Sequence, residues 1–200
     1  MNHSYNTISK MGSSGAYREK GSKFLSFAYR VHSEDDIKTI LEDLRKKYHD
    51  ARHHCYAWIL GEEATRFRAN DDGEPSGTAG NPILQQIRSF ELTNILIVVV
   101  RYFGGTLLGT SGLIRAYKNA ARDALEQAEI CLIYMTRPYS LHFPYALMND
   151  VMKILKEFRI KPEFETYDTI CELQADVPIH RIQSLHDRLE VLQSVQIKAL

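Results

Sequence analysis

The chain has 200 residues, of which 44% are hydrophobic and 25% are charged, and its 25 lysines and arginines equal its 25 aspartates and glutamates in number. This composition predicts a globular protein of one or two domains with an adequate core, and it excludes an intrinsically disordered chain. The net charge of zero excludes a strong overall attraction to nucleic acid or to a membrane surface.

The N-terminal segment and the cysteines indicate where the protein is found. Residues 1–15 are polar and rich in small side chains, without the apolar core of a signal peptide, and they predict a loose tail. No segment is apolar over the length that a membrane-spanning helix needs. Cys55, Cys131 and Cys171 are odd in number and widely spaced, which predicts a reducing compartment, the cytoplasm, and neither a disulfide framework nor a CxxC metal site.

The first part of the chain predicts strands that alternate with helices. Alternating apolar residues predict a strand over 24–31, and periodic apolar residues predict a helix over 34–48 that Ser33 caps. Acidic residues in the first turn of this helix and basic residues in its last turn complement the helix dipole. The following patterns predict strands over 54–60 and 65–69, a short helix over 82–89, a buried strand over 95–101 and a long helix over 112–128.

A domain boundary is expected over 130–137, where the long helix ends and Pro138 opens a new alternating segment. The pattern then restarts as strand, helix, two strands and helix, over 139–143, 147–158, 164–167, 169–177 and 182–192. This order predicts a small ferredoxin-like domain over 134–200, after a first domain over 1–133. The second domain holds eight basic and nine acidic residues, a net charge of −1, without a basic run.

A glycine-rich segment joins the buried strand to the long helix. It runs from Arg101 to Arg115 and contains Gly104, Gly105, Gly109 and Gly112. A helix start leaves backbone N–H groups unpaired at the positive end of the dipole, and glycines let a phosphate or carboxylate approach them. The same glycines also suit a tight structural connection, so both interpretations stay open. The spacing matches neither GxxxxGK[ST] nor GxGxxG, and neither pattern supports a nucleotide site.

An acidic loop over 70–82 precedes a helix start at Pro82. Its carboxylates, Asp71, Asp72 and Glu74, offer the oxygen ligands that Mg²⁺ prefers, and such an ion would hold a phosphate against the helix start. The alternative is turn chemistry, in which aspartates accept backbone hydrogen bonds and acids favour a helix N-terminus without any metal. We expect no cofactor, and magnesium remains the less favoured alternative.

Charges are distributed unevenly around these loops. Residues 81–122 hold five basic residues and one acidic residue, a net charge of +4, whereas residues 62–74 hold two basic and five acidic residues, a net charge of −3. This distribution allows the acidic loop to face the basic one. Arg115, Lys118 and Arg122 form a stripe beside the apolar face of the long helix. Such a stripe is either solvated surface or part of a binding surface.

His53, His54 and Cys55 form a further group on a predicted strand. Alternation places His53 and Cys55 on one face of the strand and His54 on the other. A zinc site would need about four ligands, and a nucleophilic thiol would need a base within reach, neither of which the local sequence supplies. A buried cysteine and a hydrogen-bonded histidine are the favoured interpretation.

Two long motifs in this order resemble the signature of the YigZ/IMPACT family. They are DDGEPSGTAGNPIL over 71–84 and RYFGGTLLGTSGLIRAY over 101–117. The similarity covers about 17–126, including Lys20–Phe24 and Asp50–Ala57, and departs from the usual pattern at His54, where the family generally has Asn, and at Ser111, where glycine is common. The family consists of small cytoplasmic proteins tied to translational control.

The resemblance implies an α+β fold and a role in translation. It implies a first domain with a β-α-β arrangement that resembles the second domain of small-subunit ribosomal protein five. The C-terminal ferredoxin-like domain looks like the fifth domain of elongation factor G. A non-enzymatic regulator of translation is expected, which binds RNA, the ribosome or a translation-associated protein, without a membrane partner and without readout of DNA sequence. The oligomeric state does not follow from the sequence.

The surface expected to bind an anion or nucleic acid consists of Arg101, Gly104, Gly105, Gly109, Thr110, Ser111, Gly112, Arg115, Lys118 and Arg122, and the acidic loop adds Asp71, Asp72, Glu74, Ser76 and Thr78. No catalytic residue is identified. The alternative is a metal-dependent enzyme acting on a phosphorylated or nucleotide substrate, with Arg101 clamping phosphate and Thr78, Thr110 or Ser111 positioning a reacting oxygen. This alternative lacks an identifiable general base. In a third interpretation both loops serve folding alone.

Overall fold

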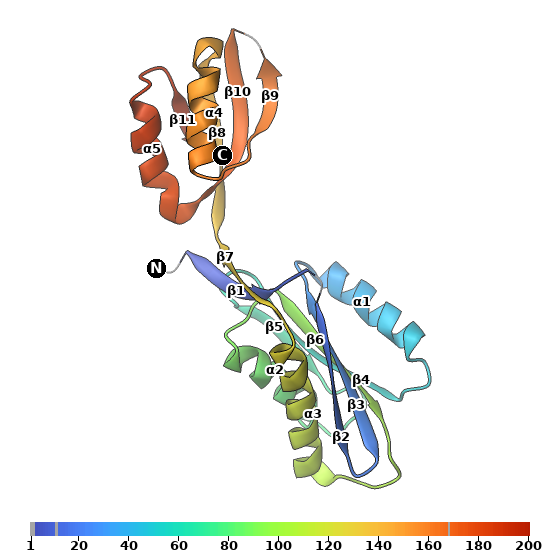
Figure 1. Ribbon diagram of the computed structural model, residues 1–200. Helices are drawn as coiled ribbons and strands as arrows, with labels where there is room; N and C mark the ends of the chain where they lie inside the picture. Colours follow the sequence, from blue (N-terminus) through green and yellow to red (C-terminus); the bar gives the residue numbers. More distant parts are fainter. Residues whose placement is uncertain (1–2, 11, 168) are drawn as a thin grey trace. The chain divides into compact units, whose positions relative to one another are not determined.

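The computed structural model describes residues 3–10, 12–167 and 169–200, and Figure 1 labels its helices and strands. It separates into two compact units, one formed by Tyr5–Ile133 and the other by Tyr134–Leu200 together with His3 and Ser4. Both units combine helices with antiparallel strands, so the protein belongs to the α+β class. Within these described ranges, no helix has the length and apolar character needed to cross a membrane.

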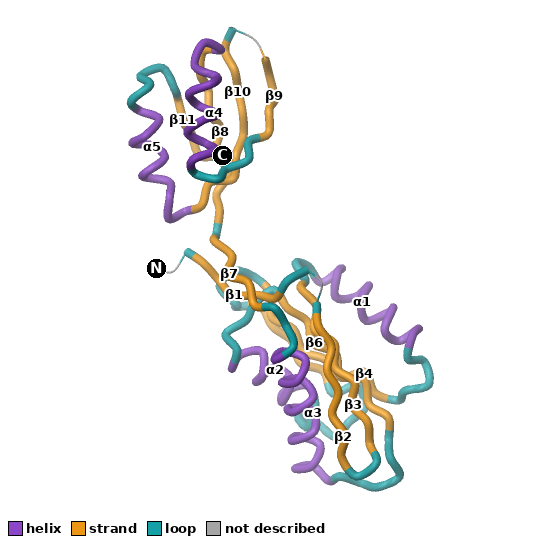
Figure 2. Tube along the Cα trace, in the orientation of Figure 1, coloured by secondary structure: helices purple, strands orange, loops and turns teal. Residues whose placement is uncertain are grey.

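A five-stranded antiparallel sheet lies at the centre of the first unit, in the order β2-β3-β6-β4-β5 (Figure 2). Its strands are β2 (Ser13–Glu19), β3 (Ser22–Arg30), β4 (His53–Leu60), β5 (Arg66–Asn70) and β6 (Ile95–Tyr102). The apolar run of β6 occupies the central position, where both faces of the strand are buried. This burial explains why the run lacks the alternation of a strand with one exposed face.

Helices cover both faces of this sheet. They are α1 (Glu34–Lys47), α2 (Gly80–Ser89) and α3 (Gly109–Glu126). In β6, Leu96 and Val98 belong to the core that α1 covers, whereas Ile97 and Val99 belong to the core that α2 and α3 cover. Successive side chains of a strand point to opposite faces, which is why sequence neighbours enter different cores.

The start of α1 confirms the predicted cap. The Asp36 N–H donates to Ser33 Oγ, and the Ser33 N–H donates to Asp36 Oδ2, both at 3.1 Å. This reciprocal pair is a capping box, which satisfies two N–H groups that the helix itself leaves unpaired. By contrast, α3 begins at Gly109, three residues before the predicted start, because the low helix propensity of glycine hides the true start in the sequence.

The N-terminal segment corrects the prediction of a loose tail. β1 (Ser4–Ile8) and β7 (Ile130–Tyr134) form a two-stranded sheet, and β2 is an edge strand of the five-stranded sheet. β7 also occupies most of the expected boundary at 130–137. Three residues of the predicted tail, Met1, Asn2 and Met11, lie outside the described residues.

The small polar residues of this segment bind α3 rather than solvent alone. Ser13 Oγ donates to the carbonyl oxygen of Ala124 at 2.6 Å, and the Ala16 N–H donates to Asp123 Oδ2 at 2.7 Å. Short side chains let the strand approach the helix closely enough for these bonds. A composition typical of a disordered tail is therefore also that of an edge strand packed on a helix.

The second unit is built on a four-stranded antiparallel sheet with the order β11-β8-β10-β9. Its elements are β8 (Thr136–Pro144), η1 (Tyr145–Leu147), α4 (Met148–Glu157), β9 (Glu163–Tyr167), β10 (Ile170–Pro178), η2 (Ile179–Arg181), α5 (Ile182–Glu190) and β11 (Gln196–Ala199). Both α-helices pack into one apolar core on the same face of the sheet (Figure 1). The strand-helix-strand-strand-helix-strand order is that of ferredoxin-like units. The sequence pattern missed β11, which is short and largely exposed.

Candidate functional site

The two loops singled out in the sequence meet in the first unit. In the structure the acidic loop is reduced to residues 71–79, which connect β5 to α2, because Asn70 belongs to β5 and 80–82 belong to α2. Within the glycine-rich segment, residues 103–108 form the turn that connects β6 to α3, which we call the glycine-rich turn. Arg101, near the end of β6, donates from Nη1 to Glu74 Oε1 at 2.7 Å, and the Tyr117 hydroxyl on α3 donates to the same oxygen at 2.7 Å. Glu74 therefore ties the acidic loop to both elements that flank the glycine-rich turn.

Arg101 and Glu74 form a buried ion pair. Their side chains are 7% and 4% exposed, and the Arg101 guanidinium also lies 5.5 Å from the ring centroid of Phe24 and 5.7 Å from that of Phe103. In this structure the Arg101 guanidinium is engaged by Glu74, and contact of Arg101 with an external anion stays a prediction. The burial of β6 continues through Arg101, and its charge is compensated inside the protein by Glu74.

Asp71 organises the start of α2. Its Oδ1 accepts the N–H groups of Ala79 and Gly80 at 2.9 and 2.8 Å, and its Oδ2 accepts the Gly77 N–H at 2.8 Å. Burial by itself would raise the pKa of Asp71, but these three backbone hydrogen bonds lower it below the ordinary value. The carboxylate thus serves an uncapped helix start, since the N-cap residue Ala79 has no side-chain oxygen.

Asp72 joins the acidic loop to β4 and α1. Its Oδ2 accepts the backbone N–H of His54 at 2.7 Å, and its Oδ1 accepts Arg45 Nη2 at 3.1 Å. His53 Nδ1 lies 2.9 Å from the carbonyl oxygen of Asp72. Burial lowers the pKa of His54, although the charge of Asp72 opposes this shift. Both histidines therefore belong to the framework that fixes the loop.

These contacts suit a magnesium ion poorly. Asp71 accepts backbone N–H groups, Asp72 pairs with Arg45, and Glu74 pairs with Arg101, so each carboxylate is already engaged. Across the described ranges, no group of three or more His, Cys, Asp or Glu side chains is arranged to hold a metal ion. Of the hydroxyls expected in this loop, Thr78 is buried and donates to the carbonyl oxygen of Pro75 at 2.6 Å, whereas Ser76 is exposed. Turn hydrogen bonds account for the contacts of Asp71 and Thr78, and long-range ion pairs account for those of Asp72 and Glu74.

Cys55 joins Glu74, Arg101 and Tyr117 in a buried network of hydrogen bonds. Its Sγ donates to the carbonyl oxygen of Asp71 at 3.0 Å and lies 3.3 Å from the Tyr117 hydroxyl. Burial raises the pKa of the Cys55 thiol and also that of Tyr117 well above their ordinary values. Both groups are therefore neutral at physiological pH, and a buried neutral thiol is a poor nucleophile.

The glycine-rich turn is shaped by close backbone contacts. A Cβ at Gly104 would lie 1.9 Å from the carbonyl carbon of Gly21, and the Gly104 N–H donates to Ser22 Oγ at 3.2 Å. Gly109 has a φ of +70°, in the left-handed region that favours glycine. A structural role therefore accounts for these two glycines. Gly105 is exposed in the turn, and Gly112 is buried in the first turns of α3.

An exposed surface surrounds the start of α3. The N-cap residue Leu108 has no side-chain oxygen, and in the described part of the chain no side chain caps this helix. Thr110 and Ser111 in the first turn are exposed, and so are the side chains of Phe103 and Leu107, at 55% and 83%. Unpaired N–H groups at the positive end of a helix thus adjoin two uncovered apolar side chains. We call residues 103–111 together with Lys118 the α3 turn surface.

The basic stripe on α3 carries less free charge than the sequence indicates. Arg115 forms an ion pair with Glu19, which lowers the pKa of that carboxyl, and Arg122 pairs with Glu126 at 2.7 Å. Lys118 is exposed and has no ion pair among the residues that the structure describes. The local surplus of positive charge is therefore largely neutralised by carboxylates that come from other elements or from the far end of α3.

Sequence reasoning missed two features of this region. The hydrogen bond from Tyr117 to Glu74 spans 43 positions and leaves no local pattern. Phe103 and Leu107 lie inside the glycine-rich motif, and apolar residues in a loop do not indicate by themselves whether they are covered. Their exposure depends on which elements pack nearby.

Comparison with known proteins places both loops in one family. Residues 20–125 match the model described as Impact N-terminal domain. The chain is 35% identical over 176 residues to IMPACT family member YvyE of Bacillus subtilis (strain 168), with 84% of this chain and 81% of that protein covered. It is 32% identical over 172 residues to IMPACT family member YigZ of Escherichia coli (strain K12), with 85% and 84% covered. A crystal structure described as that of a hypothetical protein covers 100% of this chain and 98% of its own, at 29% identity and a TM-score of 0.75. Because the similarity extends through both loops and over most of each chain, this protein is a member of the IMPACT family.

Proposed function

We propose that this protein is a non-enzymatic, translation-associated binding protein that contacts ribosomal RNA through the α3 turn surface. The link to translation rests on the family, because its members are tied to translational control. The observation that carries the choice of surface is the uncapped first turn of α3 beside Phe103 and Leu107, which are 55% and 83% exposed.

The chemistry of this surface suits a single-stranded or looped RNA. Backbone N–H groups at a helix start bind phosphate oxygens without any need for a basic side chain. An exposed aromatic ring such as Phe103 offers a platform on which a base stacks. Because Arg115 and Arg122 are paired with carboxylates, Lys118 supplies most of the uncompensated charge. We therefore expect affinity to fall with salt less steeply than for a strongly basic surface.

The proposal assigns no catalytic role to the acidic loop. A metal-dependent enzyme would need the oxygens of Asp71, Asp72 and Glu74 as ligands, and these oxygens hold the loop itself together. A nucleophilic mechanism would need an ionised Cys55, and burial raises the pKa of that thiol. We accordingly propose that the buried network keeps the α3 turn surface in its shape.

The remaining parts of the proposal concern cofactor, location and fold relationships. We propose that the protein works without a cofactor, in the cytoplasm, and with translation-associated partners. We further propose that the first unit is related to the second domain of small-subunit ribosomal protein five, and the second unit to the fifth domain of elongation factor G. The absence of a cofactor is tested by measuring the thermal midpoint of unfolding at increasing magnesium concentrations, since a bound ion would raise that midpoint.

The test is co-sedimentation with ribosomes across a salt series. The main variant is Ser111→Glu, which places a carboxylate in the first turn of α3. This charge stabilises the helix by about 0.3–1 kcal/mol but repels a phosphate at the same place. We expect ribosome binding to weaken about tenfold while thermal stability stays equal or rises, because one lost phosphate contact is worth about 1.4 kcal/mol. A second variant, Leu107→Ser, removes an exposed apolar side chain without disturbing the core.

Val191→Ser is the matched control, because Val191 is 69% exposed and belongs to the second unit. This control is expected to bind as the wild type does. If the wild-type protein stays in the supernatant even at low salt, ribosome binding is wrong. If the wild type binds and both Ser111→Glu and Leu107→Ser bind equally well, the function stands but the surface is elsewhere.

A further inference from the structure

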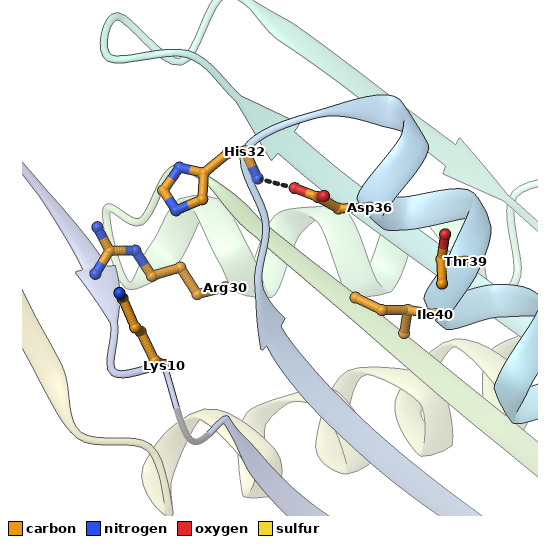
Figure 3. A pocket seen from close by; sticks show the side chains of 6 residues that line it. All are labelled: Lys10, Arg30, His32, Asp36, Thr39 and Ile40. Atoms are coloured by element: carbon orange, nitrogen blue, oxygen red, sulfur yellow. Dashed lines mark hydrogen bonds between the residues drawn. The ribbon is translucent and has the colours of Figure 1, made fainter.

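A pocket of about 450 Å³ lies in the first unit beside the start of α1. It is lined by Lys10, Arg30, His32, Asp36, Thr39 and Ile40 (Figure 3). Lys10 follows β1, Arg30 ends β3, His32 precedes α1, and the other three belong to α1. Lys10 and the stretch over 30–40 thus supply one pocket, which the sequence pattern did not indicate.

The pocket gathers three basic side chains. The side chains of Lys10, Arg30 and His32 point toward one another in Figure 3. In the described ranges, none of these three side chains forms an ion pair. Asp36 is the acidic member of the lining, and its Oδ2 accepts the backbone N–H groups of His32 at 2.8 Å and Ser33 at 3.1 Å. The carboxylate is therefore held by the backbone at the helix start, and the basic side chains are left for an anion.

An unsatisfied buried atom supports this interpretation. Arg30 Nε is buried and has no hydrogen-bond partner within the described part of the chain. A buried N–H group without a partner is costly, and native proteins rarely keep one without a reason. The planar guanidinium that contains this atom lies between Lys10 and His32 in Figure 3, and its two terminal nitrogens suit the oxygens of a phosphate group.

The pocket is separate from the α3 turn surface. In the pairing of β3 with β6, Arg30 lies opposite Ile95, whereas Lys23 lies opposite Tyr102 next to the glycine-rich turn. Seven residue steps along β3 separate these two ends of the sheet, which corresponds to roughly 23 Å. A ligand in the pocket and a partner on the α3 turn surface therefore use different residues.

We propose that this pocket binds the terminal phosphate of a small phosphorylated molecule. Lys10, Arg30 and His32 contact the phosphate oxygens, and Thr39 and Ile40 contact the organic part of the ligand. A phosphomonoester carries up to two negative charges and several acceptor oxygens, which match three converging basic side chains. The volume of about 450 Å³ leaves room for an organic part larger than phosphate alone.

The test is a titration of the full chain by isothermal calorimetry at constant ionic strength, with three probes. They are inorganic phosphate, a nucleoside 5′-monophosphate and a single-stranded RNA oligonucleotide without a terminal phosphate. We expect saturable binding of the first two probes, with the nucleotide tighter because Thr39 and Ile40 contact its organic part. The RNA without a terminal phosphate is expected not to compete with either.

The variant is Lys10→Gln with His32→Gln, both at exposed positions where a change leaves the core intact. We expect phosphate and nucleotide affinity to fall about tenfold or more, since two contacts to the phosphate, one of them from a lysine, are lost. Lys38→Gln is the matched control, because Lys38 lies on α1 outside the pocket lining. It removes one lysine charge, as Lys10→Gln does, and is expected to leave affinity unchanged.

Three results would overturn the proposal. The first is the absence of saturable binding of phosphate and nucleotide by the wild type up to about 10 mM. The second is equal affinity of the wild type and the double variant, with thermal midpoints confirming that both are folded. The third is binding of the RNA probe at least as tight as that of the nucleotide and lost in the same variant, which would assign the pocket to a polynucleotide backbone instead.

Discussion

The buried ion pair between Glu74 and Arg101 offers the sharpest test of the site's architecture. Glu74→Gln keeps the size of the side chain and one oxygen acceptor, but it removes the negative charge. The Arg101 charge would then remain in a position where its side chain is only 7% exposed, without a compensating partner. Breaking a buried pair in this way costs about 3–5 kcal/mol, so we expect the free energy of unfolding of the first unit to fall by about 3 kcal/mol.

Urea unfolding followed by Trp58 fluorescence measures this loss. Trp58 is the single tryptophan of the chain and lies buried on β4, so its signal reports the first unit alone. The control is Glu126→Gln, which removes the ion pair between Glu126 and Arg122. Their side chains are 47% and 59% exposed, respectively. An exposed pair of this kind contributes about 0.5 kcal/mol or less.

A double-mutant cycle with Arg101→Met isolates the interaction between the two charges. Removing both charges leaves no unpaired ion in the interior, so the double variant is expected to lose at least about 2 kcal/mol less than the sum of the single variants. The reasoning is refuted if Glu74→Gln costs no more than Glu126→Gln. It is refuted equally if the two single effects add within about 0.5 kcal/mol.

Three further predictions concern neighbouring groups. Gly104→Ala is expected to lower the thermal midpoint by several degrees, because its Cβ would lie 1.9 Å from the backbone of Gly21, and an unchanged midpoint would contradict this contact. The pKa of Asp71 is lower in the folded protein than its ordinary value of 3.8. The stability that its backbone hydrogen bonds contribute is therefore present above about pH 4 and is lost as the pH falls through the folded pKa. In a plot of the urea midpoint against pH, Asp71→Asn should reduce the fall of the midpoint at acid pH. Iodoacetamide is expected to modify the partly exposed Cys131 and to spare Cys55 in the folded protein, because burial raises the pKa of Cys55; mass spectrometry that found Cys55 alkylated first would show this assignment to be wrong.

The sequence determined most of the regular elements, because their signals are local. The apolar run of β6 predicted a buried strand, and Ser33 with the acidic residues that follow it predicted the start of α1. The paired motifs over 71–84 and 101–117 indicated the family. Side-chain periodicity, capping and turn residues depend on neighbours within a few positions, which is the range that a pattern reports.

Local composition misled where small or polar residues serve long-range packing. Residues 3–10 and 12–15 predict a tail, yet they contribute to β1 and β2 because they pair with β7 and β3 and bond to α3. A count of charges over 81–122 predicts a strongly basic surface, yet Glu19 and Glu74 from outside that window neutralise two of its arginines. The free energy of these contacts depends on partners that no local window contains.

Only the tertiary structure decided which charges are exposed and which are paired. Arg101 follows directly after an apolar strand, and the register of β6 in the centre of the sheet buries it against Glu74. Lys10 lies 20 residues before Arg30 in the sequence, yet both line one pocket with His32. Sheet register and helix packing fix such encounters, and the burial they impose sets whether a charge stabilises the fold or remains available to a ligand.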